Sequence, residues 1–153
     1  MNFMQLAARE ALLGMNSNHG GPFGAVIVKK GKIIAKAHNT VLKTKDPSAH
    51  AEVNAIRKAS KKLKTFDLSD CEIYASCQPC PMCLGAIMWA RIPVLYIGCT
   101  SADAASIGFD DKKFYDDFKK NGGSSLKSIS DVDREECLKV MKKWLSKKDK
   151  VPY

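Results

Sequence analysis

Two short strings about thirty residues apart constrain this chain more than any other feature. The first, at 50–52, reads H-A-E, and the second, at 79–83, reads P-C-P-M-C. One imidazole and two thiols can bind zinc and leave its fourth coordination position open. The carboxylate is then not a ligand and is available for another role. Zinc held in this way lowers the pKa of a bound water, so that a nucleophile forms near neutral pH. Any fold of this chain must therefore bring the two strings together.

Each residue type suits such a site. Cys80 and Cys83 are three apart, so they share a face in the first turn of a helix. A helix N-terminus favours negative charge and helps both thiols ionise to the metal-binding thiolate. We expect His50 as the third ligand, because two thiolates already balance the charge of Zn²⁺. We expect Glu52 to take a proton from the activated water and pass it on, a role typically worth about 10²–10⁴ in rate.

Other readings of the cysteines remain. A C-x-x-C pair also occurs in redox proteins and in structural zinc sites, and Cys77 extends the run in a way that iron–sulfur ligand sets share. A structural site would have no use for Glu52, however, and no further cysteine motif supplies a fourth ligand. We expect the remaining cysteines to be small buried residues; they are Cys71, Cys77, Cys99 and Cys137.

Length, composition and charge narrow the class of protein. The 153 residues suffice for one domain with a sizeable core. The sequence shows neither a membrane span nor a signal-peptide pattern, and the free-looking cysteines suit a reducing compartment, so we expect a cytoplasmic protein. The formal charge of +9 is mostly lysine, gathered at 58–64 and 139–150. Arginine is scarce and aromatic residues are not interleaved with these lysines, so we expect no nucleic-acid partner.

Hydrophobic periodicity predicts an α/β layered sheet. The predicted helices cover 3–15, the residues after His50, and the residues from Cys80 towards Pro93. The predicted strands cover 25–28, 32–37, 73–75 and 94–97, the first two as a hairpin. Further helices are predicted around 114–118 and over 133–147. If the helices after His50 and Cys80 lie side by side, their N-termini converge on one metal.

Five strings carry a resemblance to a known family. They read GGPFGAVIV (20–28), DPSAHAEV (46–53), CQPCPMCLGAI (77–87), WAR (89–91) and GFDD (108–111). With H-x-E … P-C-x-x-C as their centre, they make the chain resemble the cytidine-deaminase superfamily and, within it, the small bacterial guanine deaminases. The resemblance extends to at least Tyr115. The last two strings are the more specific, because tRNA adenosine deaminases typically differ after the fourth strand.

The resemblance implies a three-layer α/β/α fold of cytidine-deaminase type with a central mixed sheet. It implies Zn²⁺ on His50, Cys80 and Cys83, with Glu52 as the catalytic proton carrier. The implied reaction is hydrolysis of guanine to xanthine and ammonia in purine catabolism or salvage. The alternatives are tRNA adenosine-to-inosine deamination, deamination of guanosine, cytosine or another base, and a zinc-stabilised binding domain without turnover.

The resemblance also places residues around a small purine base. Phe23 would stack on the base with Trp89 close by, and Asn39 and the backbone of Ala51 would hydrogen-bond it. Asp111, with Asp110 as second choice, would accept from the donor edge of guanine. Adenine has a bare acceptor at that edge, so a carboxylate there selects guanine. Each residue also has a purely structural reading: the aromatic residues as core, Asn39 as a turn former and the aspartates as the start of a helix.

A homodimer is the last implication. The segment of about 121–153 would cross to the partner subunit, with Gly122-Gly123 as hinge and Tyr153 closing the neighbouring site. The whole chain, 1–153, is then a single zinc-dependent deaminase domain. Gln78 departs from the family pattern, which usually has Glu there, and is expected to affect only the surroundings of the metal.

Overall fold

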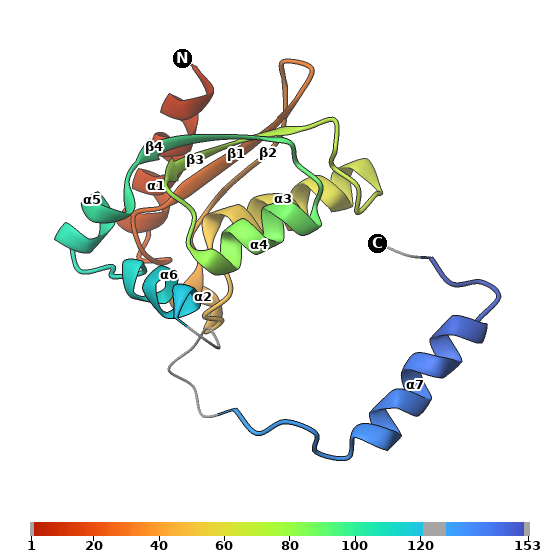
Figure 1. Cartoon of the computed structure of the whole chain (residues 1–153). Helices are drawn as coiled ribbons and strands as arrows, with labels where there is room; N and C mark the ends of the chain where they lie inside the picture. The colour runs from red at the N-terminus through yellow and green to blue at the C-terminus, as the bar shows by residue number, and fades with distance from the viewer. Residues whose placement is uncertain (1, 121–127, 152–153) are drawn as a thin grey trace.

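A mixed four-stranded sheet forms the centre of the protein (Figure 1), in a computed structural model that describes residues 2–120 and 128–151. The strands are β1 (Gly24–Lys29), β2 (Lys32–His38), β3 (Glu72–Cys77) and β4 (Val94–Cys99), in the order β2-β1-β3-β4. Strand β1 is antiparallel to β2 and β3, whereas β3 and β4 are parallel. The predicted strands and the mixed sheet are confirmed.

Helices cover both faces of this sheet. They are α1 (Phe3–Asn16) on one face, and α3 (Ala51–Leu63) and α4 (Pro81–Trp89) on the other. Side chains of β1 alternate between the two layers: Ala25 and Ile27 pack in the cluster with α3 and α4, whereas Val26 and Val28 pack against α1. The buried pattern of β1 therefore creates three layers, as predicted.

Three more helices follow the layered pattern less closely. Helix α2 (Val41–Thr44) is a single turn, and α5 (Ser101–Ser106) follows β4; neither was predicted. A capping box starts α5, because the Thr100 side chain accepts from the Asp103 backbone and Asp103 reaches back to Thr100. Helix α6 (Lys112–Lys119) lies at the predicted place around Phe114.

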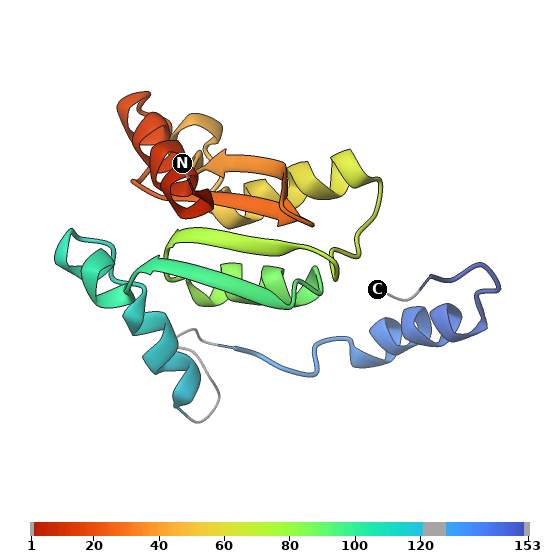
Figure 2. The ribbon, with the colours of Figure 1, turned by 90° about the horizontal axis from the view of Figure 1, so that it is seen from above.

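Helix α7 (Arg134–Ser146) is confirmed but stands away from the sheet and its helices in both views (Figure 1 and Figure 2). Its predicted apolar side is therefore exposed to solvent in this chain; its large members are Val140, Met141, Trp144 and Leu145. The predicted hinge at Gly122-Gly123 and the predicted lid residue Tyr153 lie outside the described residues.

The four other cysteines divide into two groups. Cys71 and Cys77 are buried, as expected. Cys99 and Cys137 are exposed, so the expectation that they are buried is wrong. The reason is position: Cys99 ends the edge strand β4, and Cys137 lies on α7, which stands away from the sheet. Among the described residues, no helix is long and apolar enough to cross a membrane.

Candidate metal centre and active site

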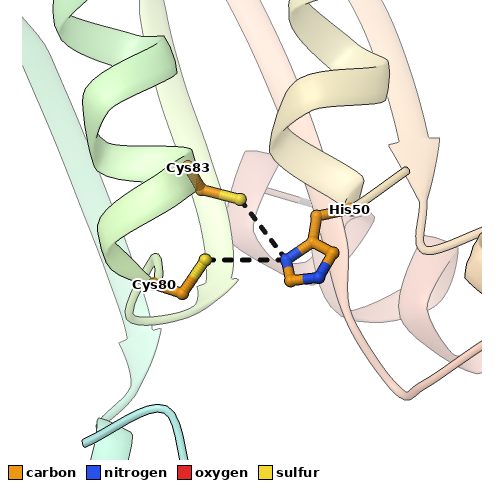
Figure 3. A group of neighbouring side chains, drawn as sticks. All are labelled: His50, Cys80 and Cys83. Carbon is orange, nitrogen blue, oxygen red and sulfur yellow. Dashed lines mark hydrogen bonds between the residues drawn. The ribbon is translucent and has the colours of Figure 1, made fainter. Parts of the chain in front are cut away.

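The two motif strings meet at the N-termini of α3 and α4 (Figure 3). His50 directly precedes α3, Cys80 directly precedes α4, and Cys83 lies in the first turn of α4. The Nδ1 atom of His50 is 3.6 Å from the Cys80 sulfur and 3.5 Å from the Cys83 sulfur. The predicted convergence of the two helices is confirmed.

His50 and Cys80 both occupy the N-cap position of their helix. Neither makes a side-chain hydrogen bond to the exposed N–H groups of the first turn. The usual cap residues Ser, Thr, Asp and Asn do make that bond. At both helices the cap side chain is therefore directed at the metal centre, while the helix N-termini favour the negative charge of the sulfur ligands.

The donor set fits zinc. Tetrahedral zinc with Zn–S of about 2.3 Å and Zn–N of about 2.0–2.1 Å separates nitrogen from sulfur by about 3.6 Å. The observed nitrogen–sulfur distances agree with that value, and the three ligand atoms all lie within 4.8 Å of one another. Three protein ligands leave a fourth position for water or substrate, which distinguishes a catalytic zinc centre from a structural one.

Electrostatics favour a thiolate at Cys80 and a protonated thiol at Cys83. The Cys83 thiol hydrogen-bonds to Cys80, and together with His50 this lowers the pKa of Cys80 well below that of a free thiol. The same shared proton, with burial, raises the pKa of Cys83. The negative Cys80 sulfur raises the pKa of His50 in turn. A divalent cation can replace the shared proton and let both sulfurs bind as thiolates.

Glu52 lies in the first turn of α3, two residues after the His50 ligand. Only 7% of its surface is exposed, and this burial raises the pKa of its carboxyl group. Glu52 also lines the same pocket as His50 and Cys80. A buried carboxyl group beside the metal ligands is placed to accept and return a proton without competition from bulk water.

A pocket of about 350 Å³ opens in front of the metal ligands. Its wall is mostly apolar and combines the loop before β1, the starts of α3 and α4, the end of β3, and the chain from α5 to α6. The lining residues are Phe23, His50, Glu52, Cys77, Gln78, Cys80, Ala104, Gly108, Phe109, Asp110, Asp111 and Phe114. Pockets of this size and character accept small molecules.

Asp111 stands out among the polar residues of this pocket. Its Oδ1 atom is buried and has no hydrogen-bond partner among the described residues. Burial, and then the negative charge of Cys80, raise the pKa of its carboxyl group. A buried acceptor left without a partner is costly, and in a pocket it marks the place where a ligand donor belongs.

The predicted pocket residues are only partly brought together. Phe23 and both aspartates line the pocket. Asn39 is buried nearby, where its Oδ1 accepts from the Val41 backbone, and the Gly20 backbone passes so close that a Cβ there would lie 2.0 Å from the same oxygen. Ala51 is buried at the start of α3. The roles predicted for Asn39 and Ala51 stay predictions.

Trp89 lies elsewhere. It is the last residue of α4, 64% exposed, with the Arg91 guanidinium 5.9 Å from the centre of its ring. At 1.5 Å per residue, α4 separates Trp89 from the Pro81 end by about 12 Å. Trp89 therefore does not reach the pocket of its own chain.

Two aromatic residues that line the pocket were not predicted from the sequence. Phe109 packs edge-on against Phe23, with ring centroids 4.9 Å apart, and Phe114 lines the same pocket. Phe109 stands inside the GFDD string beside the predicted aspartates, and Phe114 follows Asp111 by three residues on the next helix. Helical spacing from Asp111 was the signal that would have found Phe114.

An imidazole and two thiolates with an open position, next to a buried carboxyl group in a small-molecule pocket, define a zinc-dependent hydrolase. The cytidine and deoxycytidylate deaminase zinc-binding region matches residues 1–99 of the sequence. The chain belongs to this deaminase family.

Individual relatives extend the likeness over the whole chain. Guanine deaminase of Bacillus subtilis is 45% identical over 99% of this chain and 97% of its own length. Its crystal structure aligns with a TM-score of 0.93, and the alignment covers 100% of this chain and 99% of that chain. A guanine deaminase structure from Nitrosomonas europaea aligns with a TM-score of 0.67 at 32% identity, and the alignment covers 71% of this chain and 63% of that chain. A tRNA-specific adenosine deaminase of Buchnera aphidicola is 34% identical over 95% of this chain and 93% of its own length.

Proposed function

We propose that this enzyme hydrolyses guanine to xanthine and ammonia. The observation that carries the proposal is the buried, unpartnered Oδ1 of Asp111 in the pocket beside His50 and Cys80. Guanine presents N–H donors on the edge where adenine has an acceptor, so guanine satisfies this oxygen and adenine leaves it without a partner. A site that depends on such a hydrogen bond discriminates far more sharply than an apolar pocket.

The aromatic residues complete a surface for a flat base. Phe23 and Phe109 lie edge to face, and Phe114 adds a third ring to the lining. Aromatic side chains stack on a purine through a large apolar area, while one or two polar atoms fix its orientation. Asn39 and the Ala51 backbone remain the further base contacts that we propose.

The proposed reaction replaces the exocyclic amine at C2 by the oxygen of water. Bound zinc supplies a water of lowered pKa. Glu52 takes the proton that this water loses, passes it to the neighbouring ring nitrogen, and moves a second proton to the amine. The new C–O bond stays, the C–N bond breaks, and ammonia leaves. Burial of Glu52 keeps these transfers within the pocket.

Ammonia release tests the substrate directly. The zinc-loaded enzyme is offered guanine, guanosine, adenine, cytosine and a tRNA anticodon stem-loop in parallel. We expect turnover of guanine, with kcat/KM at least about 10³-fold above that for adenine, because adenine cannot satisfy Asp111. Turnover of the stem-loop with a steep salt dependence, and none of guanine, would instead establish the tRNA deaminase alternative.

The position of α7 supports a second part of the proposal, a homodimer that exchanges its C-terminal segment. In this chain α7 exposes a row of apolar side chains, with Met141 67% exposed. The edge strand β4 also exposes apolar side chains, among them Tyr96 and Ile97. Rows of exposed apolar side chains of this kind mark interaction sites, and on this proposal a second copy of the chain presents the complementary parts. On this proposal the segment 121–153 belongs to one domain shared by two subunits.

The same arrangement gives roles to Trp89, which does not line the pocket of its own chain, and to Tyr153, which lies outside the described residues. Trp89 is too far from its own pocket to contact a purine there. A second subunit can bring Trp89, and Tyr153 at the end of the exchanged segment, to the neighbouring site. The proposed contacts of Trp89 and Tyr153 with the base therefore depend on the dimer.

Truncation tests the exchange. We expect the full chain to have the mass of a dimer in light scattering, and a chain ending at Lys150 to remain dimeric but lose about tenfold or more in kcat/KM, because α7 holds the subunits together and Tyr153 closes the site. A chain ending at Ser130, which lacks α7, is expected to be monomeric or to aggregate. Monomeric full-length protein, together with full activity of the chain ending at Lys150, contradicts the exchange.

A cytoplasmic location completes the proposal. All six cysteines are free of disulfides, and three of them belong to the metal centre or lie beside it in the pocket. Free thiols and a thiolate-bound metal persist in a reducing compartment.

A further inference from the structure

Tyr115 connects the helix that carries Asp111 to the loop that carries the metal ligands. Its hydroxyl donates to the backbone carbonyl of Pro79 at 2.5 Å, directly before Cys80. The bond spans thirty-six positions of sequence, so it ties two distant segments of the pocket wall together. Tyr115 itself is not among the residues that line the pocket.

Asp111 and Tyr115 lie one helical turn apart. Asp111 is the N-cap of α6, and its backbone carbonyl accepts from Phe114 at 3.0 Å and from Tyr115 at 3.4 Å. Residues four apart share a face of a helix. The hydroxyl of Tyr115 therefore fixes the same face of α6 from which Asp111 enters the pocket.

The Asp111 side chain has no such support of its own. It makes no side-chain cap bond with α6, and its Oδ1 is buried without a partner in the described structure. A carboxylate has a lower free energy in water than in such a buried position, so it stays there only where the backbone holds it. Whatever fixes the start of α6 therefore decides whether Asp111 faces the substrate or turns out to solvent.

Gln78 completes the connection. Its Oε1 accepts from the Ser101 backbone at 3.3 Å, so its amide NH₂ is the group left to face the Tyr115 hydroxyl. Burial raises the pKa of Tyr115, and Gln78 acts in the opposite direction, as an amide donor to the hydroxyl oxygen does. An amide that donates to the hydroxyl oxygen leaves the hydroxyl proton free for Pro79. The carboxylate of a Glu at this position would compete for that proton instead.

We infer that Tyr115 is a positioning residue: through its bond to Pro79, and with Gln78 behind it, it holds Asp111 in the pocket and so sets the affinity for the base. This inference rests on the proposed function for the identity of the base. It also accounts for Gln78, where the family pattern has Glu, as the partner that this tyrosine requires.

Tyr115→Phe removes the hydroxyl and keeps the ring. Loss of one such hydrogen bond corresponds to about a fivefold change in an equilibrium constant, ~1 kcal/mol. We therefore expect backbone amides in residues 108–116 to exchange hydrogen about fivefold faster, with zinc content unchanged. We expect kcat/KM for guanine to fall by a similar factor, mainly through KM. The matched control is Tyr74→Phe, which removes a hydroxyl that contacts Glu72 on the α1 side of the sheet.

A double-mutant cycle shows whether Tyr115 acts through Asp111. In an Asp111→Asn background, adding Tyr115→Phe should change kcat/KM by less than about twofold, because the contact that it supports is already lost. An equal fivefold loss in both backgrounds, or unchanged exchange in residues 108–116, overturns the inference. Failure of the wild-type enzyme to turn over guanine counts against the proposed function alone, because the exchange measurement decides the role of Tyr115 without any substrate.

Discussion

Glu52→Gln should retain one zinc per chain and lose about 10²–10⁴ in kcat for guanine. The amide has nearly the shape of the carboxyl group, so the buried position beside His50 stays filled. It cannot accept and return a proton, however, so the water is not activated and the amine is not protonated as it leaves. Zinc content by elemental analysis and kcat by ammonia release measure the two effects separately.

The matched control for this variant is Glu72→Gln. Glu72 lies on β3, where it accepts from Tyr74 on the face of the sheet away from the pocket. The Glu72→Gln variant should keep kcat for guanine within about twofold of the wild-type value. If Glu52→Gln kept more than a tenth of the wild-type kcat with full zinc content, another group would have to carry the protons and the proposed mechanism would be wrong.

Cys83→Ser should remove the metal and the activity together. Cys83 is fully buried in the first turn of α4, and serine keeps its size but is a poor zinc ligand. Two ligands remain, so we expect zinc content to fall from one per chain to near zero and turnover to become undetectable. Bound zinc stabilises the folded state, so the melting temperature should fall as well.

A chelator separates the loss of metal from a local packing defect. It should lower the melting temperature of the wild-type protein towards that of Cys83→Ser and leave the variant itself unchanged. Cys137→Ser, at an exposed position of α7, should behave as wild type in every one of these measurements. A Cys83→Ser protein that binds zinc with unaltered stoichiometry would exclude Cys83 from the ligand set.

The metal centre was predictable because its chemistry is local. Cys80 and Cys83 lie within one helical turn, and the string around His50 starts another helix, so spacing alone fixed how each half is presented. The alternation of strands and helices then predicted a layered sheet, on which the two helices bring the halves together where they lie side by side. Family resemblance was needed for the three-layer fold, the substrate and the residues predicted around the base.

The aromatic wall of the pocket and the exposure of two cysteines could not be predicted in the same way. Phe109 meets Phe23 only because the segment after β4 folds back over the loop before β1, a contact between positions far apart in the sequence. Cys99 lies at the end of an edge strand and Cys137 on a helix that stands away from the sheet, and no local pattern in the sequence reports either position.

Trp89 shows a further limit. Its string is part of the resemblance, and its helix was predicted correctly. The predicted helix already ran from Cys80 towards Pro93, so the sequence placed Cys80 and Trp89 near its opposite ends. Only the resemblance placed Trp89 close to the base, and in the structure Trp89 ends α4 and is not among the residues that line the pocket.

The helix starts at His50 and Cys80, neither of which has a side-chain cap bond, carry a consequence for the stability of this enzyme. Replacing His50 or Cys80 by Asp or Ser would supply the missing cap and strengthen each helix by about 1 kcal/mol, and would destroy the metal centre at the same time. The loss of zinc would remove the stability that metal binding contributes, so the gain from the cap appears only in the metal-free protein. Thermostable variants that still work must gain their stability elsewhere in the molecule, because both cap positions are committed to the metal.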